Sequence, residues 1–312
     1  MVRDELHALR RENRLLRKEV ASLRRGLERM GGGLKGILGR RGLRLHRLAP
    51  ADRLLVSPGL SDEGKDRLYD LLHRYPFRLL LRDIIKAKDG FRAEEMTSYS
   101  PLYAVRGYLS SLEGLGLVAR DPNGRYRLTR TRVTSFGETL EWFVAEVLRR
   151  EFFAETIHSA SFRTPPPGGD FDVIAAMEGI LIYVEVKSSP PRGIEAEEVA
   201  GFLRRREILL PHVAMFLVDT HLRMWDKMVP IMEELLGGAP RDSGQAHRVV
   251  QRLEREIFHV GHRLYVLNSS RGIRSNLRCC LSDFLRRGNP WTMIPGPSSG
   301  EQMGPLDGSR PF

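Results

Sequence analysis

The sequence predicts an α/β protein that carries two smaller modules ahead of its main domain. Three observations lead to this prediction. Residues 2–30 repeat apolar side chains at heptad spacing, residues 61–131 indicate helices followed by a β-hairpin, and residues 134–288 alternate helix and strand patterns. We therefore expect an N-terminal coiled-coil helix, then a small helical domain with a hairpin, and finally an α/β domain with a mixed sheet.

The composition indicates a folded protein with an anionic partner. Hydrophobic side chains make up 41% of the 312 residues, which is enough for real cores, and the formal net charge is +11. Such a balance is typical of nucleic-acid binding, although an Arg-rich solvated surface would give the same value. The two cysteines are adjacent, at 279 and 280, and form neither a disulfide framework nor a metal-knuckle spacing. Because no apolar run reaches transmembrane length and the N-terminus is charged, we expect a cytoplasmic protein without a membrane partner.

The heptad repeat of residues 1–30 predicts a parallel coiled-coil homodimer. Leucine occupies most d positions, while Asn13 and the β-branched Val20 lie at a positions, as in parallel two-stranded coils. Glutamate at g precedes arginine at the following e position three times, so the charges of two parallel helices would pair in register. The alternative is a single amphipathic helix packed on its own chain. The residues that we expect to hold the dimer are Leu9, Asn13, Leu16, Val20 and Leu23.

Residues 31–60 predict a basic linker. Three glycines at 31–33 end the helix, and the following stretch is rich in Gly, Arg and Leu with little periodicity. Residues 1–47 hold fourteen Lys or Arg against five Asp or Glu. Such an arm could hold phosphates without reading sequence, or it could simply be solvated.

Residues 61–131 predict two helices, a short helix, a further helix and a hairpin. Ser61 is a helix N-cap, Ser100-Pro101 begins the last helix, and Asp121-Pro122-Asn123-Gly124 forms the hairpin turn. This order, with the helix exit LSSLEGLGLV at 109–118, resembles the winged helix-turn-helix family. The resemblance implies DNA contact through the last helix and the hairpin, although winged helices also dock proteins. The implied nucleic-acid-binding residues are Tyr99, Tyr103, Arg106, Arg125 and Arg127.

The hairpin at 168–189 is the most informative stretch of the chain. Two β-prone runs flank the turn Glu178-Gly179; Asp172 lies on the first, and Glu185 and Lys187 share one face of the second. Charges in a run this apolar need a reason, because an unpaired buried charge is expensive. An exposed ion pair at the end of an edge strand is the plainer explanation, but the nearby Asp172 favours a site.

The spacing D-x12-E-x-K of this hairpin resembles the PD-(D/E)xK nuclease superfamily, particularly its restriction-endonuclease-like and archaeal Holliday-junction-resolvase-like members. The resemblance covers about residues 137–287 and implies a restriction-endonuclease-like core of order α-β-β-β-α-β. It also implies a metal-dependent DNA endonuclease that hydrolyses phosphodiester bonds as a homodimer on duplex or branched DNA. The alternative is a dimeric winged-helix DNA-binding regulator whose nuclease-like domain is a non-catalytic scaffold.

The same resemblance makes Asp172, Glu185 and Lys187 the catalytic residues, with Mg²⁺ as cofactor and Mn²⁺ as a possible substitute. Mg²⁺ prefers oxygen ligands, which the two carboxylates and the Val186 carbonyl could supply. Lys187 could orient the attacking water or stabilise the charged transition state. Glu141, on the first helix of the domain, is either a further metal ligand or an ordinary surface residue.

Two softer expectations complete the α/β domain. Asp170 is an alternative to Asp172 as a ligand, but Asp172 fits the family pattern better. The elements that we expect after the hairpin are helices at 194–210, 222–236, 243–259 and 274–287, and strands at 213–218 and 262–267. Residues 289–312, rich in Gly, Pro and Ser, predict a tail without fixed structure.

Overall fold

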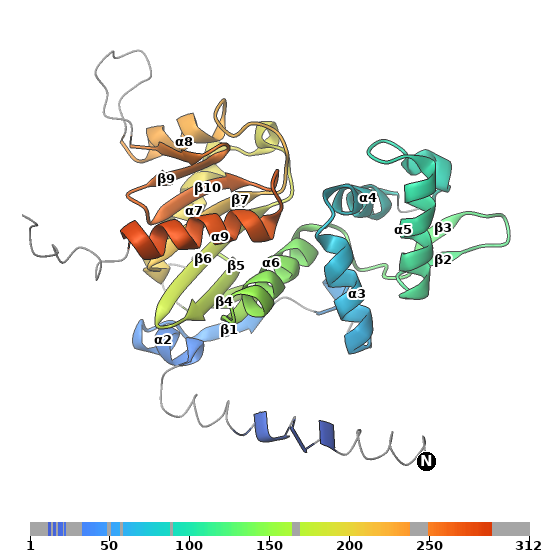
Figure 1. The fold of residues 1–312 in the computed structure, drawn as a ribbon, viewed down its shortest axis with the longest axis horizontal. Helices are drawn as coiled ribbons and strands as arrows, with labels where there is room; N and C mark the ends of the chain where they lie inside the picture. Colours follow the sequence, from blue (N-terminus) through green and yellow to red (C-terminus); the bar gives the residue numbers. More distant parts are fainter. Residues whose placement is uncertain are drawn as a thin grey trace, which may run out of the picture.

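A mixed eight-stranded sheet forms the core of the larger part of the molecule (Figure 1), in the strand order β1-β4-β5-β6-β7-β10-β9-β8. The computed structural model describes residues 33–48, 51–56, 59–87, 90–163, 169–237 and 249–288, with scattered helical positions between 12 and 22. The strands are β1 (Leu45–Leu48), β4 (Glu155–Phe162), β5 (Phe171–Met177), β6 (Ile180–Lys187), β7 (Val213–Val218), β8 (Gln251–Glu254), β9 (Ile257–Val260) and β10 (Leu264–Asn268). Strands β4, β5 and β6 are antiparallel, whereas β7 runs parallel to both β6 and β10. The predicted α/β class with a mixed sheet is confirmed.

Helices cover both faces of this sheet. Helices α6 (Gly137–Glu151) and α9 (Ile273–Asp283) pack on the face that carries Val184 and Val186. Helices α2 (Leu34–Arg40), α7 (Ala196–Leu209) and α8 (Met228–Leu235) pack on the opposite face, which carries Tyr183. Covered on both sides, β6 is apolar nearly throughout, as expected of a central strand with a parallel neighbour.

Residues 62–128 form the small domain in the predicted order of elements. These are α3 (Asp62–Leu72), α4 (Tyr75–Lys86), η2 (Ala93–Met96), α5 (Leu102–Gly114), β2 (Val118–Arg120) and β3 (Tyr126–Leu128). The Ser61 hydroxyl accepts a hydrogen bond from the Gly64 N–H at 3.0 Å, so the predicted cap of α3 is present. The Tyr69 and Phe143 rings lie 5.6 Å apart, and the apolar core of the small domain continues into the α6 face of the sheet.

The prediction of a loosely packed linker at 31–60 is wrong where the structure describes this stretch. Leu34 and Leu38 of α2 are buried against the sheet, and β1 pairs antiparallel with β4 as an edge strand. A seven-residue helix is too short to reveal its periodicity. All four residues of β1 are exposed, so neither face of this strand needs apolar side chains. Its sequence therefore lacks the alternation of apolar and polar residues that would predict a strand.

The helix predicted at 243–259 is also wrong over the described residues from 249 on, because β8 and β9 form an antiparallel hairpin there. Val250, Leu253 and Ile257 have helical spacing, which explains the error. A tight turn with Arg255 at φ 49° shifts the second strand so that Ile257 and Phe258 are buried beside β10. The helix predicted at 222–236 begins only at Met228.

Two predicted segments lie wholly or largely outside the described residues. These are the coiled coil of residues 1–30, of which scattered positions are described as helical, and the tail at 289–312. Among the described residues, we find no helix with the length and apolar character needed to span a bilayer.

A buried ion-pair network fastens α4 to the end of β7. Asp219 is fully buried, and Arg78 donates to both of its carboxylate oxygens, at 2.9 and 2.7 Å. Arg82 donates to one of these oxygens at 2.5 Å and Ser269 to the other at 2.7 Å. Burial alone would raise the pKa of Asp219, but the two guanidinium groups outweigh this effect and hold it below its usual range.

We expect Asp219→Asn to lower the free energy of unfolding by about 3–5 kcal/mol, because it leaves two guanidinium groups without their counter-charge. Urea denaturation measures this loss. Asp226→Asn is the matched control: its ion pair with Arg223 is solvent-exposed and contributes less than about 1 kcal/mol. Equal losses for the two variants would contradict the assigned role of Asp219.

Candidate active site

Asp172 lies where the pairing of β5 with β6 ends. The two strands pair from Met177↔Ile180 to Val173↔Val184. Beyond that point, the Val186 N–H donates to the Asp172 Oδ2 atom at 2.7 Å. The carboxylate thus replaces a backbone carbonyl of the ladder, and it lies beside residues 185–187.

Glu185 is buried and has three polar partners. Its side chain is 1% exposed and points to the α7 face of the sheet. Its Oε1 atom accepts from Arg205 at 2.6 Å and lies 3.1 Å from the Lys187 Nζ atom, while Oε2 accepts from the Tyr183 hydroxyl. As the alternation of the strand predicts, Glu185 and Lys187 share one face and Val184 and Val186 the other.

Lys187 joins the strand to α7. Its Nζ atom lies between Glu185 and the Glu198 Oε2 atom, at 3.1 and 3.0 Å. Burial alone would lower the pKa of Lys187, but Glu185 and Glu198 outweigh burial and raise it, so the ammonium is charged at neutral pH. Glu197, in contrast, pairs with Arg204 at the surface.

Glu141 of α6 belongs to the same group of acids. The Ser159 hydroxyl donates to its carboxylate, but burial, Glu138 and Glu185 raise the pKa of Glu141 to about 7. Burial, Glu185 and Glu141 likewise raise the pKa of Asp172 well above its usual range. Glu141, Asp172 and Glu185 therefore lie within electrostatic reach of one another. Asp170 is exposed instead and lies 3.7 Å from Arg47.

Sequence reasoning did not identify Arg205 and Tyr183 as members of this site. Arg205 Nε donates to the Tyr183 hydroxyl at 2.8 Å, and its other nitrogen binds Glu185. Burial alone would lower the pKa of Arg205, but Tyr183 and Glu185 outweigh this effect and raise it. A signal for Tyr183 was present, since it lies two residues before Glu185 on the same strand face. Arg205 is one of three consecutive arginines, and only the rotation of α7 against the sheet distinguishes it.

The donor set fits a hard divalent cation in chemical type. Carboxylate oxygens are the ligands that Mg²⁺ prefers, and the raised pKa values of Asp172 and Glu141 indicate negative charge that a cation would offset. In the part of the chain that the structure describes, no three His, Cys, Asp or Glu side chains converge as a metal cluster. Arg205 and Lys187 instead neutralise Glu185.

Four of the five predicted nucleic-acid-binding residues lie on α5 or in the β2–β3 hairpin of the small domain. Tyr103 is 81% exposed on α5, whereas Tyr99 precedes this helix, because α5 begins only at Leu102. Arg106 forms an ion pair with Glu94 at 2.9 Å. In the hairpin, Arg125 donates to the Gly90 carbonyl at 2.7 Å, and Arg127 is an exposed residue of β3.

No protein-family model and no curated protein matches the chain. Among solved structures, it is similar to protein VC1899 from Vibrio cholerae, at 15% identity and a TM-score of 0.49, over 81% of this chain and 62% of that chain. It is also similar to Can2 from Sulfobacillus thermosulfidooxidans in complex with cyclic tetra-adenylate, at 12% identity and a TM-score of 0.46. That likeness covers 81% of this chain and 60% of Can2. The chain thus spans about six tenths of the length of either protein. Neither likeness assigns it a function, so the proposal for its function rests on its own residues.

We expect Glu141→Gln to flatten the dependence of stability on pH in the metal-free protein. Since folding raises the pKa of Glu141 to about 7, stability falls as pH rises from the ordinary value of 4.5 through 7. The variant lacks this loss, which is on the order of 3 kcal/mol, and should be the more stable protein at pH 8. Urea denaturation across this pH range, in a chelator, measures the difference.

The matched control is Glu207→Gln, on the exposed side of α7. This variant should follow the wild-type curve. A Glu141→Gln curve parallel to that of the wild type would show that Glu141 is not held in a buried acidic pocket.

Proposed function

We propose that this protein is a metal-dependent nuclease that hydrolyses phosphodiester bonds in DNA. The observation that carries the proposal is the arrangement around Glu185. The Lys187 Nζ atom lies 3.1 Å from the Glu185 carboxylate, and the Asp172 carboxylate accepts a hydrogen bond from the Val186 N–H. Two acids and a lysine on adjacent strand ends can supply metal ligands and a positive charge for metal-assisted phosphodiester hydrolysis. The net charge of +11 also favours a polyanionic substrate.

Each residue of the site has a distinct role in this proposal. Asp172, Glu185 and Glu141, with the Val186 carbonyl, would hold Mg²⁺ or Mn²⁺. The cation, when bound, supplies charge neutralisation at the phosphate and a more acidic water. Lys187 remains protonated and stabilises the negative charge that develops on the phosphate oxygens.

Arg205 has a positioning role in the same proposal. Its two bonds fix the rotamers of Glu185 and Tyr183 on the sheet, so the Glu185 carboxylate is held beside Lys187.

The Arg205–Glu185 ion pair is also the observation that favours the second candidate, a DNA-binding regulator with a non-catalytic scaffold. A guanidinium that already neutralises Glu185 lessens the need for a cation. This candidate predicts DNA binding that needs no metal and survives Asp172→Ala. The two candidates therefore differ in a single measurement, the cleavage of DNA in the presence of metal.

We infer that the small domain is a winged helix that contacts DNA and that residues 1–30 form a parallel coiled coil. The outward position of Tyr103 on α5 supports the first inference. Leu16 and Val20, which are 55% and 47% exposed in the single chain, support the second, since a dimer would cover them. Two copies joined in this way would bring two sites to duplex or branched DNA.

Incubation of the protein with plasmid and branched DNA in Mg²⁺ or Mn²⁺ tests the nuclease proposal. We expect cleavage by the wild type and a loss of at least about 100-fold in Lys187→Ala, because a charged group at the transition state is removed. Lys65→Ala, at an exposed ion pair of α3, is the control and should cleave normally. Absence of cleavage by the wild type, or normal cleavage by Lys187→Ala, would refute the catalytic assignment.

The coiled coil is tested by sedimentation of the full-length chain. Leu16→Glu places a charge at a d position and should convert the dimer to monomer. Lys18→Glu, at an outward-facing f position of the same repeat, keeps the helix and should leave the dimer intact. If both variants sediment like the wild type, residues 1–30 do not hold the dimer.

A further inference from the structure

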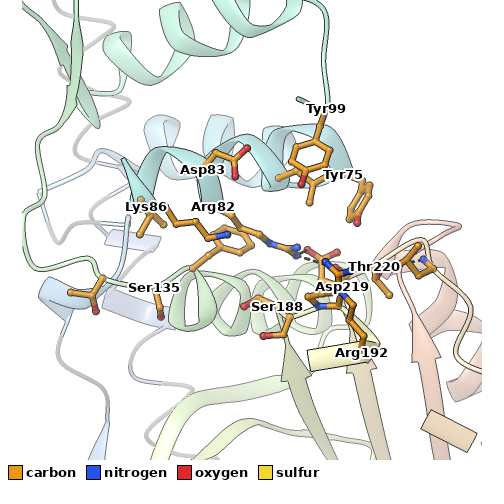
Figure 2. A pocket seen from close by; sticks show the side chains of 17 residues that line it. Tyr75, Arg82, Asp83, Lys86, Tyr99, Ser135, Ser188, Arg192, Asp219 and Thr220 are labelled. Carbon is orange, nitrogen blue, oxygen red and sulfur yellow. Dashed lines mark hydrogen bonds and ion pairs between the residues drawn. The ribbon is translucent and has the colours of Figure 1, made fainter. Parts of the chain in front are cut away.

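A cleft of about 670 Å³ lies between the small domain and the sheet (Figure 2). One wall is α4, with Tyr99 beside it. The other wall consists of the segments that follow β6 and β7, including Ser188, Arg192 and Thr220. The cleft is therefore built by both parts of the molecule, and Arg82 reaches across it to Asp219.

The cleft carries positive charge that its surroundings leave available. Lys86 and Arg192 both line it, and both are exposed. Neither side chain forms an ion pair with any residue that the structure describes. The opposing acids are Asp219, which is neutralised by two arginines, and Asp83. Burial raises the pKa of Asp83, although the charges of Lys86 and Arg82 lower it. Phosphate groups could thus bind at Lys86 and Arg192 without displacing an existing ion pair.

Tyr99 adds an aromatic surface to this charge. Its side chain is 56% exposed and lines the cleft. The neighbouring Tyr75 is already occupied, because it stacks on His221 at 3.8 Å and the Arg78 guanidinium lies 5.3 Å from its ring centre. Tyr75 therefore forms a fixed wall, and Tyr99 presents the ring face on which a ligand could stack.

The cleft adjoins the segment that follows β6, the strand that carries Glu185 and Lys187. Ser188, which lines it, directly follows Lys187 in the chain. The Asp219 N–H donates to the Lys187 carbonyl at 2.8 Å, so the end of β6 and the floor of the cleft are joined. The catalytic candidates Asp172, Glu185 and Lys187 do not themselves line the cleft, so a polymer lying in it would run along the segment that follows Lys187.

We propose that this cleft binds an unpaired nucleic-acid strand, with phosphates at Lys86 and Arg192 and a base stacked on Tyr99. Basic grooves with exposed aromatic rings are typical of single-strand binding. In a duplex the bases stack on one another, so a tyrosine ring within a cleft meets a base face only where the strand is unpaired. The proposal rests on the proposed nuclease function, because it defines the form of substrate that reaches Lys187.

Fluorescence anisotropy of the full-length protein in a chelator tests binding separately from cleavage. The probes are a labelled single-stranded DNA, the same sequence as RNA, and the matching DNA duplex. We expect tighter binding of at least one single strand than of the duplex. Tyr99→Ala should weaken single-strand binding about tenfold, within the range of one lost base stack. Arg192→Gln should weaken it and reduce the slope of log affinity against log salt by about 0.7.

Two controls match these variants in chemistry. Phe153→Ala removes an aromatic side chain that is 89% exposed and does not line the cleft, and Arg278→Gln removes an exposed charge on α9. Both should bind like the wild type. Wild-type affinity in Tyr99→Ala and Arg192→Gln, or tighter binding of the duplex than of either single strand, would overturn the proposal.

The two proposals fail in different ways. Metal-dependent cleavage together with unaffected strand binding in the cleft variants overturns only the cleft. Strand binding that depends on Tyr99, without cleavage by the wild type, supports the cleft and removes the nuclease. Preference for the DNA or the RNA strand supports the cleft in either case and identifies the sugar that it accepts.

Discussion

The arrangement of this molecule depends on one buried carboxylate. Asp219 lies just after the end of β7, is fully buried, and is neutralised by two arginines of α4. A buried charge is tolerated only when its partners remain in place, so the network joins α4 to the end of β7 in addition to the apolar core that the two parts share. The cleft, and with it the relation between α4 and the candidate active site, follows from this constraint.

The candidate active site is an arrangement of excess acid balanced by a few cations. Arg205 and Lys187 neutralise Glu185, whereas Asp172 and Glu141 have raised pKa values and retain their protons more readily. Such a site responds to any cation that enters, whether a proton or a metal ion. This property connects the pH dependence of the metal-free protein with the metal dependence that we propose for the reaction.

Local signals explain what could be predicted from the sequence. The hairpin that carries Asp172 and Glu185 has a strong turn and two β-prone runs, and the small domain has helix caps and a hairpin turn. The β8–β9 hairpin could not be predicted, because Val250, Leu253 and Ile257 have helical spacing and only pairing with β10 decides between helix and strand. The role of Arg205 could not be predicted from the sequence either, because it depends on which side of α7 faces the sheet.

The edge strand β1 has a practical consequence for the preparation of shorter chains. It covers β4, whose backbone groups would otherwise form an open edge of the sheet. Open edges pair readily with strands of other molecules and promote aggregation. A truncation that removes not only the N-terminal repeat but also residues up to and beyond Leu45 would therefore yield a protein prone to aggregation. A shorter chain keeps α2 and β1 intact if it starts at or before Gly33, the N-cap residue of α2.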